Sequence, residues 1–456
     1  MEIKKFGAII FDSKTSPTSG WASFGDNGAP IQFIDQTELP SDVLWWSDCP
    51  YEAYHEHGRF SSNIRPSSYL SVTPKEIMAE WDINEKNIDP EACARVCGTV
   101  FNHAMRIVRG ILKLTCPDRD AGSYFSEPTL AADLAGILPP FDYPKGDALE
   151  ILKPNVAYSN ISHTTVPWGP SLETIAVRRP RLDHAIRLLG SPAPVGPFEH
   201  VRGADLPPLP DLIHLDRPVL AEIVVHRADP RYAPIFGWNV SGSRGVKVQR
   251  SWATHPELAA LATFADIEIR SAYIGSAYNH LSSQLPDVVR SLVAEGSGSL
   301  SWSAGVAVDT LWRSATVGKS IKSGTKYRRA HTTWQGAWLK AYDKVEMFRL
   351  AMALHQSGFR VANYGNGQVR CYMPKERYLE LFLTAFQLGM VPAIVEVTQP
   401  VSPALLRQRI WGGDTETRSL AWKILTREAG DLWMMNRYPI ASREDRAAMV
   451  EKVKAC

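Results

Sequence analysis

Residues 359–373, FRVANYGNGQVRCYM, predict two short β-strands joined by a tight turn. Asn-Gly is typical of two-residue hairpin turns because both positions accept a positive φ angle at low cost. The preceding residues 333–356 place apolar side chains at intervals of three and four, and Gly358 supplies a helix stop. A long helix therefore leads directly into a hairpin.

The rest of the chain predicts a mixed α/β fold. Alternating or β-branched runs are typical of strands, whereas apolar residues at helical spacing are typical of helices. The predicted strands are residues 4–13, 219–226 and 264–273, and the predicted helices are residues 89–114, 180–189 and 376–389.

The length of the chain indicates more than one domain. At 456 residues and 45% hydrophobic, it exceeds the size of about 250–300 residues at which single cores stop growing. Residues 191–211 contain six prolines, which exclude regular helix and favour an extended connection rich in turns. We therefore expect a division at Asp205, into domains 1–205 and 206–456.

The composition favours a cytoplasmic protein. The six cysteines lack the regular spacing of a secreted disulfide framework, and Cys93 with Cys97 is interpreted as core packing rather than a metal site. No run reaches the roughly 18 apolar residues of a membrane helix, so no membrane partner is expected. The net charge is only +2, from 50 basic and 48 acidic residues. Affinity for a polyanion must then depend on where the charges lie.

Two carboxylates in the predicted strand 264–273 are candidate metal ligands. Asp266 and Glu268 alternate by two, so both side chains leave the same face of the strand. Two-metal phosphoryl-transfer sites need carboxylates that converge from separate strands. The alternative is an edge strand with a solvated polar face.

The order of these elements resembles that of family B DNA polymerases, closest to the protein-primed phage and plasmid branch. Ser271-Ala272-Tyr273 matches the Ser-x-Tyr of the first palm motif in that family, which places Glu268 at the metal-binding aspartate. The resemblance implies an RNase H-like exonuclease-type N-terminal domain and a polymerase-like palm with reduced fingers and thumb. The fingers would span about residues 300–345 and the thumb about residues 400–456.

Most of the acidic residues of that family are missing at the matching positions. The hairpin turn Gly365-Asn366-Gly367 lacks the two aspartates, and Lys14 replaces the exonuclease glutamate that follows Asp12. Asp183 would be a third exonuclease remnant. Without these charges, two metal ions are poorly neutralised and positioned, so efficient nucleotide addition and proofreading are not expected. No cofactor is required, and Mg²⁺ or Mn²⁺ would bind only if the residual site is active.

A basic segment follows the predicted strand pair. Residues 310–345 hold eight lysines and arginines against Asp343 alone. Proteins that bind nucleic-acid strands without sequence preference typically combine basic groups with aromatic rings. The alternative is a solvated helix face with tryptophans in the core. Trp334 and Trp338 follow the apolar stripe and are assigned to the core. The predicted nucleic-acid contacts are Tyr273, Lys319, Lys322, Lys326, Arg328, Arg329 and Arg360.

These features lead to one principal hypothesis and two alternatives. The principal hypothesis is a catalytically degenerate polymerase-like protein that binds DNA in the replication or maintenance of a phage, plasmid or other mobile element, with replication proteins as further partners. The first alternative is an active nucleotidyltransferase or nuclease with a non-standard metal site. The second is a protein-interaction or virion component that keeps only the fold. The principal hypothesis requires the Asp266/Glu268 strand to meet the hairpin turn at a basic groove.

Overall fold

The apolar run at residues 5–11 forms β1 (Lys5–Phe11), the middle strand of an N-terminal sheet in the computed structural model. β2 (Gly20–Ser23) and β3 (Ile31–Phe33) continue from it as an antiparallel meander, whereas β4 (Val43–Ser47) and β5 (Ile64–Arg65) run parallel to β1 on its other side. The strand order is β3-β2-β1-β4-β5.

The structure describes residues 5–13, 16–25, 28–50, 53, 63–70, 72–74, 77, 89–115, 147–148, 150–152, 161–162, 173–179, 181–238, 251–280, 305–310, 321–323, 326–328, 333–374 and 377–392.

Helix α3 (Pro90–Thr115) covers one face of the N-terminal sheet, as its apolar spacing predicts. Phe101 from this helix stacks on Trp46 of β4, with ring centroids 5.7 Å apart. Cys93 and Cys97 are buried in the same core, where burial raises the pKa of both thiols. Short 3₁₀ helices, η2 (Gln36–Glu38) and η3 (Ser67–Tyr69), flank the strands.

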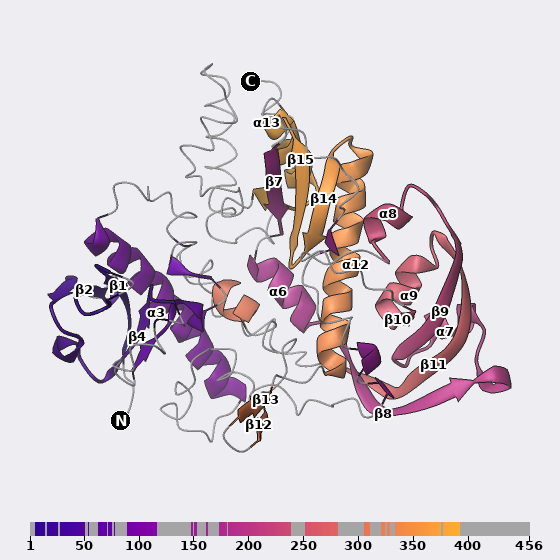
Figure 1. Ribbon diagram of the computed structural model, residues 1–456, viewed down its shortest axis with the longest axis horizontal. Helices are drawn as coiled ribbons and strands as arrows, with labels where there is room; N and C mark the ends of the chain where they lie inside the picture. The colour runs from indigo at the N-terminus through magenta and orange to yellow at the C-terminus, as the bar shows by residue number, and fades with distance from the viewer. Residues whose placement is uncertain are drawn as a thin grey trace.

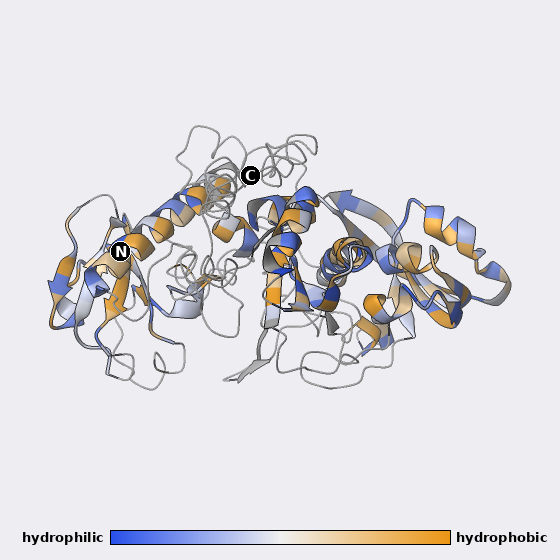
Figure 2. Ribbon diagram, turned by 90° about the horizontal axis from the view of Figure 1, so that it is seen from above, coloured by the Kyte–Doolittle hydropathy of each residue, from blue (hydrophilic) through white to orange (hydrophobic). Residues whose placement is uncertain are grey.

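A second, four-stranded sheet lies at the opposite end of the molecule (Figures 1 and 2). It is antiparallel throughout, in the order β10-β9-β11-β8. Its strands are β8 (Pro192–Arg202), β9 (Val219–Ala228), β10 (Trp252–Thr254) and β11 (Ala265–His280). The short helices α7 (Leu209–His214), α8 (Ala233–Phe236) and α9 (His255–Leu261), with the 3₁₀ turn η6 (Gly203–Asp205), connect them.

The third sheet holds the predicted hairpin. β14 (Arg360–Gly365) and β15 (Gln368–Met373) pair as predicted, and the strand order is β16-β7-β15-β14-β6. The other strands are β6 (Ile161–Ser162), β7 (Glu173–Arg178) and β16 (Val391–Pro392). Helices α6 (Arg181–Leu189) and α13 (Tyr378–Gln387) confirm two further predictions.

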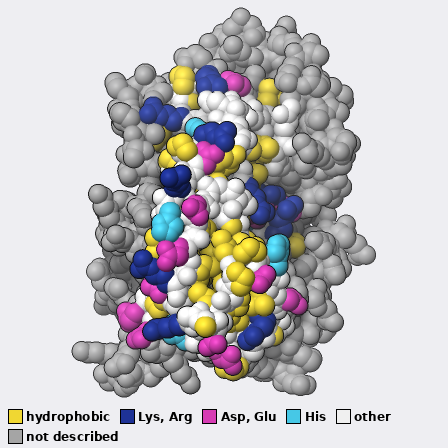
Figure 3. All heavy atoms as spheres, turned by 90° about the vertical axis from the view of Figure 1, so that its right-hand side faces the viewer, with side chains coloured by type: hydrophobic (Ala, Val, Ile, Leu, Met, Phe, Trp, Pro, Cys, Tyr) yellow, Lys and Arg dark blue, Asp and Glu magenta, His cyan; other side chains and the backbone are white. Residues whose placement is uncertain are grey.

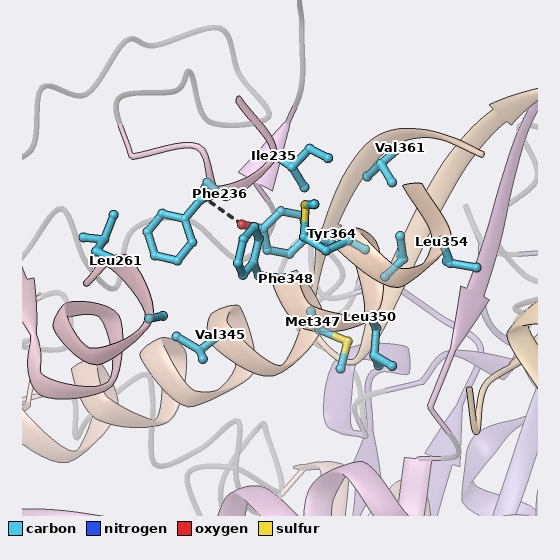
Figure 4. Packing of buried hydrophobic residues seen from close by; sticks show 14 of the residues in the cluster. Ile235, Phe236, Leu261, Val345, Met347, Phe348, Leu350, Leu354, Val361 and Tyr364 are labelled. Atoms are coloured by element: carbon cyan, nitrogen blue, oxygen red, sulfur yellow. Dashed lines mark hydrogen bonds between the residues drawn. The ribbon is translucent and has the colours of Figure 1, made fainter. Parts of the chain in front are cut away.

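The long helix α12 (Trp334–Gln356) packs between the hairpin sheet and the four-stranded sheet (Figure 1). It buries residues on all sides, as expected of a helix covered on two faces. Phe348 lies between Phe236 from one side and Tyr364 from the other (Figure 4). The Tyr364 hydroxyl donates to the carbonyl of Phe236 at 2.9 Å, which ties the hairpin to α8. Trp334 and Trp338 are buried, as assigned.

The proline-rich stretch 191–211 is not a linker, and this prediction was wrong. Its first half forms β8, an edge strand that pairs only with β11 among the described strands. Proline lacks a backbone N–H, and an edge strand leaves half of these groups unpaired, so prolines are tolerated there. Because β8 and β7 precede Asp205 while their sheet partners follow it, a division at Asp205 would cut through two sheets.

Candidate nucleic-acid interface

The two faces of the hairpin sheet differ in chemistry. Val369, Cys371 and Met373 of β15 point into the main core, so the alternate residues of this strand lie on the opposite face. We call this opposite face the hairpin-sheet face. Residues paired directly across neighbouring strands share a face, and its described side chains are Thr174, Ala176, Arg178, Arg360, Asn363, Gln368, Arg370 and Tyr372.

Three arginines form a diagonal row across the hairpin-sheet face. Arg178 of β7 pairs with Gln368, Arg370 is the next residue of β15 on this face, and Arg360 of β14 pairs with Tyr372 one step further. Each step thus moves one strand across and two residues along, which corresponds to about 8 Å between neighbouring Cα atoms. Arg360 is exposed and the other two arginines are half-buried. Such a row suits a chain of phosphates because guanidinium forks match phosphate geometry.

The described side chains of the hairpin-sheet face include no carboxylate. Mg²⁺ and Mn²⁺ prefer carboxylate and other oxygen ligands. Nor does any part of the described chain gather three or more histidine, cysteine, aspartate or glutamate side chains in a group that could hold a metal ion. The charged side chains described on this face are thus its three arginines.

A buried aspartate of α12 holds the hairpin turn by accepting hydrogen bonds from its backbone. Asn366 and Gly367 have φ angles of 52° and 75°, as the Asn-Gly sequence predicts. Asp343 of α12 accepts the Asn366 N–H at 2.6 Å and the Gly367 N–H at 2.9 Å, and its Oδ1 lies 3.0 Å from His184 Nε2. Burial acts to raise the pKa of Asp343, but His184, Lys340 and the Asn366 amide outweigh it and hold this pKa below its ordinary value. This carboxylate is thus committed to the turn.

A network of ion pairs anchors the end of β7 beside the turn. The backbone N–H of Arg179 donates to the carbonyl of Gly367 at 2.8 Å. Its guanidinium lies 2.9 Å from Glu346 and 3.4 Å from Asp183, and Asp183 also accepts from Arg187 at 3.0 Å. The candidate exonuclease residue Asp183 therefore lies at the hairpin. The neighbouring Arg178 donates from its Nε to the carbonyl of Arg179 at 3.2 Å.

Asp266 and Glu268 do not meet the hairpin, contrary to the geometry that the principal hypothesis requires. They belong to β11, in a different sheet, and α12 packs between the two sheets. Ile267 and Ile269 of β11 turn toward the core, while the two carboxylates are exposed. Glu268 pairs with His226 at 2.9 Å, and both side chains are about half exposed, at 52% and 50%. At these residues β11 pairs only with β9 among the described strands, which is the arrangement of an edge strand with a solvated polar face.

Two carboxylates lie at the carboxyl ends of neighbouring strands in the N-terminal sheet. Asp12 follows β1 and accepts from the Ser19 hydroxyl at 2.7 Å. Asp48 follows β4 and accepts from the Phe11 N–H at 3.0 Å. Since β1 and β4 are parallel, both acids lie at the carboxyl end of the sheet. Sequence reasoning found Asp12 but missed Asp48, although the apolar strand 43–47 directly before it is a comparable signal.

The remaining predicted contacts are dispersed. β12 (Ile321–Ser323) and β13 (Lys326–Arg328) form a two-stranded ribbon, whereas Lys14, Lys319, Arg329 and the predicted thumb lie outside the described residues. The described part does not include the side chains of Lys322, Lys326 and Arg328. Tyr273 lies in the four-stranded sheet and stacks on His200. On this side of the molecule, basic and acidic side chains alternate around a hydrophobic patch (Figure 3). Of the two predicted contacts whose side chains the structure describes, Tyr273 and Arg360, only Arg360 lies on the hairpin-sheet face.

Comparisons with known proteins give matches among solved structures alone. No protein-family model matches the sequence, and no curated protein sequence matches it. The chain is similar to phi29 DNA polymerase complexed with primer-template DNA in a post-translocation binary complex, with 9% identity and a TM-score of 0.46. It is also similar to phi29 DNA polymerase complexed with single-stranded DNA, with 10% identity and a TM-score of 0.44. Each alignment covers 81% of this chain and 80% of that chain.

The described residues include no helix that is long and apolar enough to cross a membrane. The mixed α/β class predicted from the sequence is confirmed by the three main sheets and the helices that pack on them.

Proposed function

We propose that this protein binds DNA through the hairpin-sheet face and does not catalyse nucleotide transfer. The diagonal row of Arg178, Arg370 and Arg360 carries the proposal. Arginines on three adjacent strands place successive guanidinium groups along one line for a phosphodiester backbone, and the half-buried Tyr372 adds a hydroxyl group beside them. The absence of described carboxylates on this face supports binding without metal-dependent chemistry.

The proposal includes the biological setting expected from the sequence. The protein would be a catalytically degenerate relative of family B polymerases, acting in the replication or maintenance of a phage, plasmid or other mobile element. The N-terminal strand order β3-β2-β1-β4-β5, with only β2 antiparallel to its neighbours, supports an RNase H-like first domain. Its role would be structural, since Lys14 places a positive charge beside Asp12 in the sequence.

Salt-dependent binding tests the proposed interface. Log affinity for DNA should fall with log salt concentration by about 0.7–0.9 per phosphate contact. Each of Arg178→Gln, Arg360→Gln and Arg370→Gln should weaken binding and reduce that slope by about 1. Arg231→Gln is the matched control, because Arg231 is exposed, pairs with Asp229 and does not belong to the hairpin sheet. Equal affinity and equal slope in all five proteins would exclude the hairpin-sheet face.

Primer extension with Mg²⁺ or Mn²⁺ tests the absence of catalysis. We expect no extension above a no-protein control, because Asp343 is bound to the turn amides and Glu268 to His226. Extension that disappears in Asp266→Ala or Glu268→Ala would instead establish the active-transferase alternative.

The second candidate function is a metal-dependent nuclease. Asp12 and Asp48 at the carboxyl ends of adjacent parallel strands favour it, since converging carboxylates are what divalent cations need. Digestion of a single-stranded oligonucleotide with Mn²⁺ would reveal this activity. Cleavage lost in both Asp12→Asn and Asp48→Asn, but kept in Glu268→Gln, would place the nuclease site at the carboxyl ends of β1 and β4.

A further inference from the structure

Three aromatic side chains lie in contact on one face of the four-stranded sheet, and two of them, Tyr273 and His200, are stacked. Trp252 of β10 and Tyr273 of β11 have ring centroids 5.6 Å apart at 40°, and Tyr273 and His200 of β8 have centroids 4.3 Å apart at 13°. Tyr273 and His200 are direct cross-strand partners. Near-parallel rings at this spacing cover one another's faces, so Tyr273 covers one face of the imidazole.

The stack ends at an exposed residue on an edge strand. β8 is the last described strand of its sheet, and His200 is exposed whereas Tyr273 and Trp252 are half-buried. Since Tyr273 covers one face of the imidazole, the exposed face is the one on the side away from β11. A fourth flat ring could therefore stack on the exposed face of His200 and extend the series.

A basic group is fixed beside the open ring. Arg202 is exposed and its Nε donates to His200 Nε2 at 3.0 Å, so the ring accepts at Nε2 and carries its proton on Nδ1. Partial burial and Arg202 lower the pKa of His200, against the opposing effects of Glu222 and Asp147. Glu222 is itself held by the Ser271 hydroxyl at 2.7 Å. An uncharged ring and a positioned guanidinium thus stand side by side at the sheet edge.

We propose that the open face of His200 stacks one unpaired nucleobase of a single-stranded nucleic acid, with Arg202 binding the adjacent phosphate. Every base has an aromatic face, and stacking on flat side chains next to basic groups is how single strands are bound without reading sequence. Duplex DNA keeps its base faces inside the stack, so this site selects for unpaired strands. The inference rests on the proposed nucleic-acid binding and adds the strand form.

Binding of a fluorescent single-stranded oligonucleotide of about 12 nucleotides, measured by anisotropy at fixed salt, tests the site. His200→Ala should weaken binding by about fivefold or more, the effect of one lost base stack, and should leave affinity for a blunt duplex unchanged. His200→Phe should restore the affinity, because it keeps a flat ring. His226→Ala is the matched control, since His226 is an exposed histidine of the same sheet paired with Glu268 outside the stack.

The outcomes separate this site from the hairpin-sheet face. Loss of affinity in Arg178→Gln with full affinity in His200→Ala would keep the proposed function and overturn the stacking site. Equal weakening by His200→Ala on single strands and on duplex would also overturn it, because base stacking predicts a difference. If the parent protein binds neither strand form, the proposed function itself fails.

Discussion

At the scale of single residues, Asp343 determines the shape of the hairpin turn. Asp343→Asn should destabilise the protein by about 2 kcal/mol or more, because the amide offers one oxygen where two N–H groups need acceptors and its NH₂ would oppose a donor. Urea unfolding followed by circular dichroism measures this. Asp229→Asn, at a pair whose arginine side chain is 76% exposed, is the control and should change stability little. Equal midpoints for both variants would contradict the role of Asp343.

The same residue gives the fold a defined pH dependence. Because contacts in the folded state lower the pKa of Asp343, its ionised form stabilises the fold at pH values above the ordinary aspartate pKa. This contribution is lost as pH falls through the folded-state pKa. The stability difference between the parent and Asp343→Asn should therefore be constant near neutral pH and shrink in acid. Urea midpoints measured for both proteins at a series of pH values test this, and a difference that grows in acid would reverse the assigned direction.

At the scale of elements, the turn between β14 and β15 requires glycine for two separable reasons. Gly367 has a φ angle of 75°, and a Cβ added there would lie 2.7 Å from Cδ2 of the His184 ring. Gly203→Ala is a matched control, because Gly203 has a φ angle of 62° with no atom within 4 Å of such a Cβ. Both alanines carry the backbone cost of about 1 kcal/mol, but only Gly367→Ala should add the steric one. Equal losses of unfolding free energy would show that His184 moves aside freely.

Which elements the sequence predicts depends on how local their signals are. The hairpin, α12 and α3 follow from apolar spacing and turn residues within one short segment, and all three are confirmed. Strand β8 was missed because its prolines read as a linker, whereas an edge position tolerates them. The partner of the hairpin was missed for a different reason. β7 lies far earlier in the chain, and strand pairing over such a separation leaves no local pattern.

The candidate site shows the same limit. Arg360 was identified because it lies beside the hairpin, whereas Arg178 joins the row only through the long-range pairing of β7 with β15. Asp266 and Glu268 were misplaced because alternation defines a face of a strand but not what that face meets. Local patterns thus predicted most elements, while the juxtapositions that create a site required the structure.

At the scale of the whole molecule, α6 connects the N-terminal core to the hairpin. Ala185, Ile186 and Leu188 of this helix pack in the core under α3, whereas His184 contacts Asp343 at the turn. Arg181 adds a buried ion pair with Asp309 at 3.4 Å, across a long separation in sequence. The anchoring of Arg178 beside the turn consequently depends on packing in the N-terminal core.

Leu188→Ala tests this connection. Leu188 is 1% exposed, and its apolar side chain takes no part in the ion pairs of Arg179, Asp183 and Glu346. The cavity should lower the free energy of unfolding by about 2–5 kcal/mol. We expect both the N-terminal core and the hairpin turn to be destabilised. Amide hydrogen exchange should accelerate in β1 and also at Asn366 and Gly367, whose N–H groups Asp343 otherwise protects. Leu258→Ala, in the core beside the four-stranded sheet, is the control and should leave exchange in β1 unchanged. Acceleration confined to β1 in Leu188→Ala would show that the N-terminal core and the hairpin unfold independently, and DNA affinity would then be insensitive to the N-terminal domain.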